Sequence, residues 1–459
     1  MNLSAWNQFS VTRRAVIQLA AVVGTLGFAT LGLAGCDNLG GKKDKGGATQ
    51  TGAGPAAAPS TGTILIGHYA SLTGAEATFG RSTDNGLMLA LEERNAAGGV
   101  KGRKLAVKTL DDASKSSEAG NVVQRLISED KVVALIGEVA SGSSLAGGKV
   151  AQQFGVPMIS PSSTNKKVTE GRDMVSRVCF LDEFQGYVVA KFARENLQAD
   201  KVAILFDQAA PYSKGLAEAF GAEFKGLGGT VATSQAYTAG DADVSAQLQT
   251  IKTSGATAVF LPGYYTDVGN IVRQARKLDI AVPFLGGDGW DSTKLAEIGG
   301  DAIEGSYYSN HYSFDEARPE VKEFVTKYEN KFGETPDGLA ALGYDAARVM
   351  FEAMDRAPSL GGKDLAAAIA ATREFAGVTG KITLDGNRDA QKQAVVVQMR
   401  GGKPRYVATV VPKGWPEAAP AGAASAAGSG APAGAGSAAG SGAPAGSMDG
   451  SAAAGATTK

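Results

Sequence analysis

Two clusters of small hydroxyl side chains each follow an apolar run of this 459-residue sequence. Residues 141–144, Ser-Gly-Ser-Ser, come after "KVVALIG" and begin a helical pattern, and residues 162–164, Ser-Ser-Thr, come soon after "VPMIS". Hydroxyl groups and free backbone N–H groups at the start of a helix can hold a carboxylate or a phosphate. One such cluster is more often a helix cap, but two clusters after consecutive strands favour a shared polar cleft.

Aromatic and acidic residues occupy the equivalent places in the next part of the chain. Tyr212 follows "KVAILFD", Tyr264 and Tyr265 follow "TAVFLPG", and Asp288 follows "AVPFLGG". Taken alone, Asp288 reads as a turn residue or a helix cap, because Asp-Gly is a common turn signal. Together, hydroxyls in the first half and an acid in the second fit a small zwitterion, whose ammonium needs a partner once it leaves water.

The elements that must position these groups alternate between short β-branched runs and longer helical patterns. Helical periodicity is clearest at residues 86–99, where a Gly pair follows the helix, and at residues 319–332. Strands that are apolar throughout are typical of a parallel sheet covered on both faces. We therefore predict an α/β fold with two doubly wound parallel sheets, whose ligands bind beyond the carboxyl ends of the strands. The predicted strands are residues 63–69, 104–110, 131–137, 201–206, 257–263 and 281–287.

The two ends of the sequence do not have a globular composition. A basic pair at residues 13–14 precedes an apolar stretch that ends in "LAGC", with Cys36 last. "LAGC" resembles a bacterial lipobox and "TRRAVIQ" resembles a twin-arginine export signal, which implies a signal at residues 1–35, cleavage before Cys36 and a lipid on its sulfur. A transmembrane anchor is the alternative. Residues 36–62 read as a flexible tether, and residues 412–459, rich in Ala, Gly, Ser and Pro, are predicted to be disordered.

Charge and cysteine content narrow the possible partners. The chain has 45 Lys and Arg against 46 Asp and Glu, a formal charge of -1, and nucleic acid is therefore not an expected partner because phosphate binding needs a basic surface. Cys36 and Cys179 are the only cysteines. If Cys36 is lipidated, no internal disulfide can form, and Cys179 then reads as a small buried hydrophobe.

Catalytic and cofactor motifs are missing from the sequence. The only histidines, His68 and His311, do not accompany a Gly-x-Ser-x-Gly elbow. The sequence also lacks Cys-x-x-Cys, His-Glu-x-x-His and a Gly-x-x-x-x-Gly-Lys phosphate loop. We therefore expect no enzyme activity, no catalytic residue, no metal and no cofactor.

Several runs of the core carry a family resemblance. They are "SLTGAEATFG", "NAAGGVKGRKL", "TLDDAS", "ALIGEVASGSS", "GVPMISPSSTN", "AGDADVSAQL", "GGDGWDS" and "ALGYDAAR". Together they resemble the branched-chain amino-acid (leucine, isoleucine and valine) binding proteins of bacterial ABC transporters, which have the type I periplasmic-binding-protein fold. The resemblance extends from Thr63 to about Val411. It implies an extracytoplasmic, lipid-anchored monomer that captures a small amino acid and delivers it to a membrane permease.

The resemblance also implies roles for particular residues. The ligand's carboxylate and ammonium would contact a serine and a small-residue loop in the first lobe, an aromatic wall would enclose the ligand, and an acid in the second lobe would bind the ammonium. Trp290, next to that acid, would help to shape the pocket. The candidate binding residues are Phe79, Ser141, Ser162, Thr164, Tyr212, Tyr264, Asp288 and Trp290.

By the same resemblance, the chain crosses three times between two lobes. Lobe one would contain residues 63–181 and 311–375, and lobe two residues 182–310 and 376–411. A three-stranded hinge would join them, so that a ligand held between the lobes favours a closed form that the permease recognises.

Two departures from the family pattern leave the ligand open. The disulfide of the best-known members matches Ser114 and Ala140 here, so the fold lacks a link that typically contributes roughly 2–4 kcal/mol. The acid of many leucine-binding members is glutamate, whereas Asp288 is one methylene shorter. The alternatives are a binding protein or sensor of the same fold for amides, urea or aromatic acids, and a scaffold without a ligand.

Overall fold

A five-stranded parallel sheet forms the first half of the fold in the computed structural model, which describes residues 62–413. Its strand order is β2-β1-β3-β4-β5, and all four neighbouring pairs are parallel. The three strands predicted nearest the start of the core are therefore present. The strands are β1 (Ile64–Ala70), β2 (Leu105–Asp111), β3 (Ala134–Ile136), β4 (Met158–Ser160) and β5 (Val175–Arg177).

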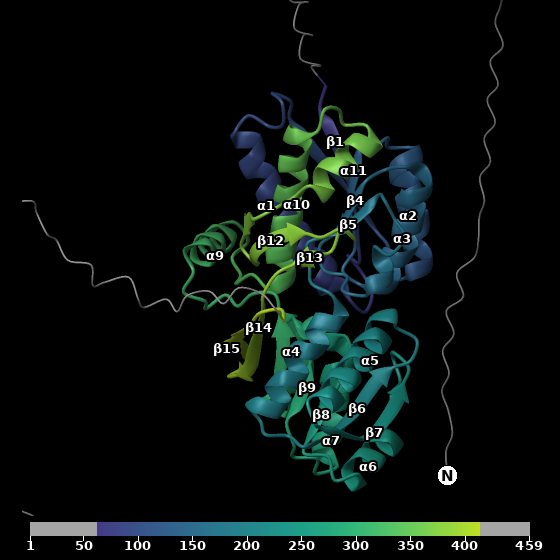
Figure 1. Ribbon diagram of the computed structural model, residues 1–459, viewed down its shortest axis with the longest axis vertical. Helices are drawn as coiled ribbons and strands as arrows, with labels where there is room; N and C mark the ends of the chain where they lie inside the picture. The colour runs from purple at the N-terminus through teal and green to yellow at the C-terminus, as the bar shows by residue number, and fades with distance from the viewer. Residues whose placement is uncertain (1–61, 414–459) are drawn as a thin grey trace, which may run out of the picture. The chain divides into compact units, whose positions relative to one another are not determined.

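Helices cover both faces of this first sheet (Figure 1). Helices α1 (Ala77–Ala96) and α10 (Gly338–Arg356) pack together on one face, with α11 (Gly362–Ala370) against α10. Helices α2 (Ser116–Ser128) and α3 (Ser141–Phe154) pack together on the other face. The predicted helical pattern at 86–99 is the second half of α1, and the pattern at 319–332 is α9 (Pro319–Phe332).

A seven-stranded sheet forms the second half, in the order β7-β6-β8-β9-β10-β14-β15. The first five strands in this order run parallel, whereas β14 and β15 add an antiparallel edge. Parallel strands were predicted at 201–206, 257–263 and 281–287, but this edge was not. The strands are β6 (Lys201–Asp207), β7 (Thr230–Tyr237), β8 (Ala258–Phe260), β9 (Phe284–Gly286), β10 (Tyr307–Asn310), β14 (Ala394–Arg400) and β15 (Lys403–Val410).

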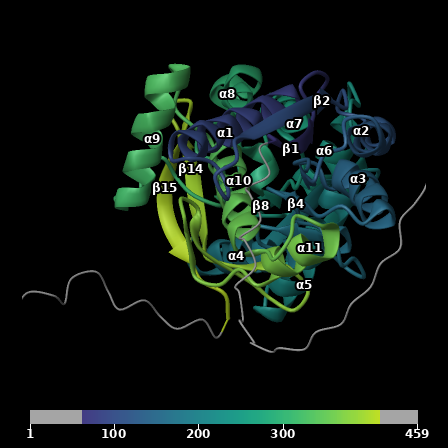
Figure 2. The same cartoon turned by 90° about the horizontal axis from the view of Figure 1, so that it is seen from above.

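Helices also cover both faces of this second sheet (Figure 2). Helices α4 (Asp182–Glu195) and α5 (Pro211–Gly226) share one apolar cluster with strands β6 and β8. Helices α6 (Ser245–Thr253), α7 (Tyr265–Lys277) and α8 (Thr293–Gly299) contribute to the cluster on the opposite face. The fully apolar strands are thus buried on both sides, as their composition predicts.

Three segments connect the two sheets: those from β5 to α4, from β10 to α9, and from a small third sheet to β14. The third sheet comprises β11 (Phe375–Gly377), β12 (Gly380–Leu384) and β13 (Ala390–Gln391). Asp345 of α10 accepts the backbone N–H groups of Val378 and Thr379 at 2.9 Å each. The lobe boundaries stay a prediction, and these contacts favour a boundary after β13 over the one predicted at residue 375.

The strand order positions a ligand site in the same way in each sheet. In each sheet the strand that comes second in the chain, β2 or β7, lies at the edge beside the first, β1 or β6. The later parallel strands follow in chain order on the other side of the first strand. The order therefore reverses between β1 and β3 and between β6 and β8, and ligands of such sheets bind beyond the carboxyl ends at this point. Within residues 62–413, no helix combines the length and the hydropathy needed to cross a bilayer.

Candidate functional site

Asp288 lies two residues beyond the carboxyl end of β9, and the whole residue is 5% exposed. The Tyr212 hydroxyl donates a hydrogen bond to Asp288 Oδ1 at 3.0 Å and accepts one from the Gly289 backbone N–H at 3.0 Å. Burial raises the pKa of Tyr212 well above its ordinary value. Tyr212 therefore keeps its proton at neutral pH and holds one oxygen of the carboxylate.

His311 holds the other oxygen of Asp288. Its Nε2 lies 3.0 Å from Asp288 Oδ2, and its ring stacks on that of Phe180 with centroids 3.8 Å apart. Burial lowers the pKa of His311 to about 4, so the imidazole is neutral at pH 7 and donates to Asp288 in the Nε2–H tautomer. Because a carboxylate oxygen has two lone pairs, both oxygens of Asp288 can still accept a hydrogen bond from a ligand.

Three aromatic rings form a continuous wall beside Asp288. Tyr212 and Tyr264 stack with centroids 5.2 Å apart and an interplanar angle of 5°. Phe79 of α1 meets Tyr264 edge to face at 5.6 Å. The wall therefore joins a residue from the helices of the first sheet to residues that follow strands of the second.

Hydroxyl groups follow strands β3 and β4, as predicted. Ser141 is the first residue of α3, and its Oγ accepts the backbone N–H of Asn165 at 3.3 Å. Ser162 and Thr164 are buried, and their hydroxyl oxygens have no hydrogen-bond partner within residues 62–413. Since buried hydroxyls are normally hydrogen-bonded, these two are available to a ligand.

The hydroxyl loops of the first sheet contact the start of α5. Asn165 Nδ2 donates to the Pro211 carbonyl oxygen at 2.9 Å. A Cβ atom added to Gly142 would come within 3.7 Å of Pro211 Cδ. The loops that carry Ser141 and Thr164 thus adjoin the residue before Tyr212, so the strand ends of the two sheets face one shared region.

Trp290 lies apart from these polar groups. Its side chain is fully buried, its Nε1–H donates to the Leu261 carbonyl oxygen at 2.9 Å, and it packs near Tyr308. A Cβ atom at Gly286 would lie only 2.1 Å from the indole ring, so the glycine makes room for the tryptophan under β9. A place for Trp290 in the ligand wall stays a prediction, since the observed contacts belong to the core.

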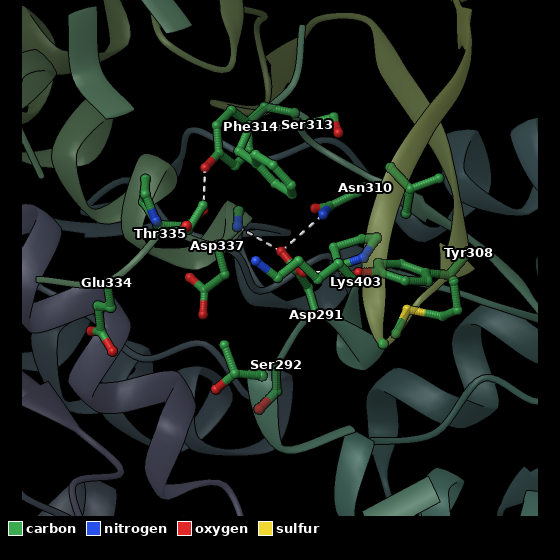
Figure 3. Close-up of a pocket in the computed structure, with 18 residues that line it drawn as sticks. Asp291, Ser292, Tyr308, Asn310, Ser313, Phe314, Glu334, Thr335, Asp337 and Lys403 are labelled. Atoms are coloured by element: carbon green, nitrogen blue, oxygen red, sulfur yellow. Dashed lines mark hydrogen bonds between the residues drawn. The ribbon is translucent and has the colours of Figure 1, made fainter. Parts of the chain in front are cut away.

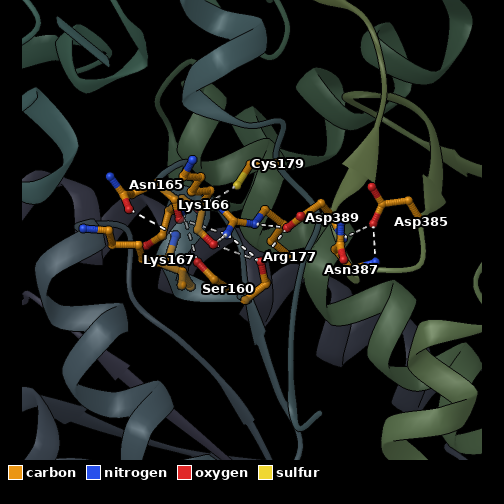
Figure 4. Close-up of polar contacts among 12 residues, drawn as sticks. Ser160, Asn165, Lys166, Lys167, Arg177, Cys179, Asp385, Asn387 and Asp389 are labelled. Atoms are coloured by element: carbon orange, nitrogen blue, oxygen red, sulfur yellow. Dashed lines mark hydrogen bonds and ion pairs between the residues drawn. The ribbon is translucent and has the colours of Figure 1, made fainter. Parts of the chain in front are cut away.

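A buried arginine holds the loop that carries the hydroxyls (Figure 4). Arg177 is fully buried and pairs with Asp389 through a Nε–Oδ1 distance of 2.7 Å. Its guanidinium also donates to the carbonyl oxygens of Ser163 and Asn165 and to the hydroxyl of Thr169. The fork geometry of the guanidinium therefore fixes the loop backbone on both sides of Thr164.

Several buried polar residues near the site were not predicted from the sequence. Glu138 is 1% exposed and accepts both the hydroxyl and the backbone N–H of Ser71, at 2.7 and 2.9 Å. Burial, reinforced by the charge of Asp112, raises the pKa of Glu138 to about 8. Glu138 stands two residues beyond β3, so the strand-end rule that flagged Ser141 could have found it.

Asp182 and Gln185 of α4 were not predicted either. Both are buried, and neither carboxylate oxygen of Asp182 nor either amide atom of Gln185 has a hydrogen-bond partner in the described part of the chain. They lie at the start of a helix, whereas the predicted residues follow strand ends. Together with His311, which follows β10 in the second crossing segment, they extend the polar surface around Asp288.

Cys36, the predicted lipidation site, lies outside the described residues.

Comparisons with known proteins agree with this fold. The family described as periplasmic binding protein matches residues 63–403. Leu/Ile/Val-binding protein homolog 2 of Brucella abortus (strain 2308) is 31% identical over 329 residues, which cover 71% of this chain and 87% of that protein.

Two solved structures share the fold closely. The leucine-binding protein LivK of Thermotoga maritima is 40% identical with a TM-score of 0.74, over 76% of this chain and 99% of the other. The branched-chain amino-acid transporter substrate-binding protein LivJ of Streptococcus pneumoniae, in complex with isoleucine, is 33% identical with a TM-score of 0.72, over 76% and 100%.

Proposed function

The chain belongs to the periplasmic binding protein family, and on that premise we propose that it captures a small aliphatic or branched-chain amino acid and delivers it to an ABC permease. The family consists of binding proteins rather than enzymes, in agreement with the lack of catalytic motifs. Its members work outside the cytoplasm, and the relatives bind leucine, isoleucine or valine by their names. This chain is therefore a binding protein like these relatives, whereas the identity of its ligand is our proposal.

One observation carries the proposal: a buried carboxylate with two neutral donors faces the region of buried hydroxyls without partners in the described chain. Asp288 would bind the ligand's ammonium, because a buried cation needs a charged partner. Ser141, Ser162 and Thr164 would donate to its carboxylate beside the first turn of α3. The aromatic wall would exclude water. The proposed ligand residues are Phe79, Ser141, Ser162, Thr164, Tyr212, Tyr264 and Asp288, with Trp290 supporting the loop.

A hinge motion would couple ligand capture to delivery. The three crossing segments form the connection between the sheets, and a ligand that contacts both sides favours the closed form in proportion to its preference for that form. A micromolar affinity corresponds to about 8 kcal/mol. One charge pair, several hydrogen bonds and an aromatic wall can supply this.

A lipid anchor would keep the protein near its permease. "LAGC" ending at Cys36 supports lipidation after export, and the arginine pair at 13–14 supports the twin-arginine route. The protein would then act as a monomer at the membrane surface. Mass spectrometry of the mature N-terminus, with Cys36→Ser as control, tests the anchor.

A thermal-shift screen tests the ligand class. Leucine, isoleucine, valine and alanine are each added to ligand-free protein, together with aliphatic amides, urea and benzoate. A ligand that binds only the native state raises its melting temperature, by an amount that grows with ligand concentration. We expect an aliphatic amino acid to give the largest shift, and a larger shift by amides or aromatic acids would favour the alternative ligand class.

Asp288→Ala tests the ammonium role. We expect this variant to lose at least about 100-fold in amino-acid affinity, measured by calorimetry, since losing one partner of a buried charge pair costs about 3–5 kcal/mol. Asp301→Ala, at an exposed residue of the short helix at 300–303, is the control for an aspartate lost outside the site. Unchanged affinity in a folded Asp288→Ala protein would remove the ammonium role.

A further inference from the structure

A cavity of about 280 Å³ lies beside the hinge (Figure 3). Its lining comes from the turn after β9, from β10 and the crossing segment that follows it, from residues 334–338 before α10, and from the β14–β15 hairpin. None of the eight predicted site residues lines it. The cavity is therefore distinct from the cluster around Asp288.

Asp291 places a fixed carboxyl group in the wall of this cavity, and burial raises its pKa above the ordinary value. It is 3% exposed. Tyr308 donates to its Oδ1 at 2.9 Å, and Asn310 Nδ2 donates to its Oδ2 at 2.8 Å. The backbone N–H of Gly338 donates to the same Oδ2. These donors hold the carboxyl group in place, and none of the three carries a charge.

Asp337 adds a second carboxyl group from the other side. It caps α10 by accepting the backbone N–H of Ala340 at 2.9 Å, and Ser82 donates to its Oδ2 at 2.6 Å. Burial, together with the charge of Asp291, raises its pKa to about 7. Within residues 62–413, the hydrogen bonds to Asp291 come from Tyr308, Asn310 and Gly338, and those to Asp337 come from Ser82 and Ala340, all of them neutral donors. Two carboxyl groups thus repel each other across a space that a cation would suit.

The rest of the lining is mostly apolar. Tyr312, Phe314, Val397 and Met399 contribute rings and aliphatic groups. Lys403 is the one basic residue among the lining residues, and it is exposed. Glu334 adds a third acid at the rim. An apolar wall opposite two fixed carboxyl groups matches a molecule with one cationic end and one apolar end.

We propose that this cavity binds a small organic cation, with its ammonium group between Asp291 and Asp337 and its apolar body against Tyr312, Phe314 and Met399. Ligand pockets usually measure about 300–1,000 Å³, so a cavity of about 280 Å³ suits a small primary amine better than a peptide. Aromatic faces near the ammonium add a cation–π attraction. This site does not depend on which amino acid binds at Asp288.

Calorimetry with the full mature protein and 2-phenylethylammonium tests this proposal, and neutral 2-phenylethanol serves as the matched probe. We expect the amine to bind at one site and the alcohol to bind at least about tenfold more weakly, a difference of about 1.4 kcal/mol. Equal binding of the two probes, or no binding of the amine at millimolar concentration, would overturn the proposal.

Three variants locate the amine. Asp337→Asn keeps a residue that caps helices well and should weaken amine binding about tenfold. Lys403→Gln removes the competing cation and should strengthen it about two- to threefold. Asp288→Asn should leave the amine affinity unchanged whether or not Asp288 binds amino acids. Loss of amine binding in Asp288→Asn, with full binding in Asp337→Asn, would place the amine at the Asp288 site and contradict the proposal.

Discussion

At the scale of single residues, two buried acids near the site, Asp288 and Asp182, differ in their hydrogen-bond partners. Asp288 accepts hydrogen bonds from Tyr212 and His311, whereas Asp182 has no partner for either oxygen in the described part of the chain. Burial raises the pKa of Asp182 to about 8, against an opposing effect of the nearby Thr164 hydroxyl, and the charge of Asp288 adds a smaller effect that raises it further. The first acid has two donors that hold both of its oxygens, whereas the second weakens the fold whenever it must ionise.

Asp182→Asn should therefore change how stability depends on pH. An unfolded aspartate has a pKa of about 3.9, so between about pH 4 and pH 8 the folded protein retains a proton that the unfolded chain has released. In that window wild-type stability falls as pH rises, and asparagine removes this contribution. We expect the free energy of unfolding of the variant to exceed that of wild type by at least about 1.4 kcal/mol between pH 5 and pH 8, the equivalent of one pKa unit.

Urea unfolding of ligand-free protein at several pH values measures this gain. Glu183→Gln is the matched control, because Glu183 adjoins Asp182 in the chain but its side chain is 51% exposed. The control should follow the wild-type pH dependence. A gain for Asp182→Asn that stays constant from pH 5 to pH 8 would show that Asp182 does not titrate in this window.

The residues that sequence could reveal share one property. Asp288, Tyr212 and Ser141 each follow a strand that is recognisable from its own composition, so locating the strand locates the residue. His311 reaches Asp288 from 23 residues away across a crossing segment, and local pattern carries no signal for that pairing. The burial of Trp290 in the core could not be predicted for the same reason, because its hydrogen-bond partner Leu261 is 29 residues away in the chain.

At the scale of elements, local composition was sufficient for β1, β2, β3, β6, β8 and β9 and for α9, whose bounds coincide with the predicted segment. The parallel strands β7 and β10 were not predicted. β14 was missed although most of its residues are apolar and buried. β15 mixes exposed and partly buried residues and has no apolar run, and β11–β13 are only two to five residues long. Short strands with mixed burial have neither a helical nor an alternating signature. Pairing in the sheet, not local composition, makes them strands.

Gly86→Ala tests the packing of two elements that are distant in sequence. A Cβ atom at Gly86 of α1 would lie 1.9 Å from the Ala340 carbonyl oxygen of α10, which is backbone and cannot rotate away. Although alanine favours a helix over glycine, overpacking of this contact should cost about 1–3 kcal/mol or more. Denaturant unfolding measures the loss.

Gly226→Ala is the control for that substitution. Gly226 is the last residue of α5, and a Cβ atom added there would meet nothing within 4 Å among the described residues. Alanine there should be neutral or stabilise by about 0.4–1 kcal/mol. Equal effects of the two substitutions would show that α1 and α10 can separate without loss.

At the scale of the whole molecule, the three crossing segments meet in one small core. Phe180 of the first crossing stacks on His311 of the second, and Lys392 of the third reaches the Val178 carbonyl oxygen of the first at 3.5 Å. Burial lowers the pKa of Lys392 to about 8. The repeated α/β pattern predicted two sheets, but the lobe boundaries depend on these long-range contacts, which composition does not encode.

A disulfide across one edge where the two predicted lobes meet tests the proposed closure. Thr78 at the start of α1 and Ser292 before α8 come from the two predicted lobes, and their hydroxyl oxygens lie 2.8 Å apart. Thr266 adds a second link there by donating to the Ala75 carbonyl oxygen at 2.8 Å. If a ligand leaves only when this edge opens, Thr78→Cys/Ser292→Cys should trap it once the pair is oxidised.

The experiment loads the double variant with amino acid, oxidises it in a Cys36→Ser background, and follows exchange against labelled ligand. Cys179 is buried and should not compete for the new thiols. We expect dissociation to slow at least about tenfold, since changes in binding act mainly on the dissociation rate, and dithiothreitol should restore it. The single variants should exchange like wild type. Equally fast exchange in the oxidised and reduced double variant would mean that the ligand escapes without separation of this edge, and the hinge would then have to open elsewhere or not at all.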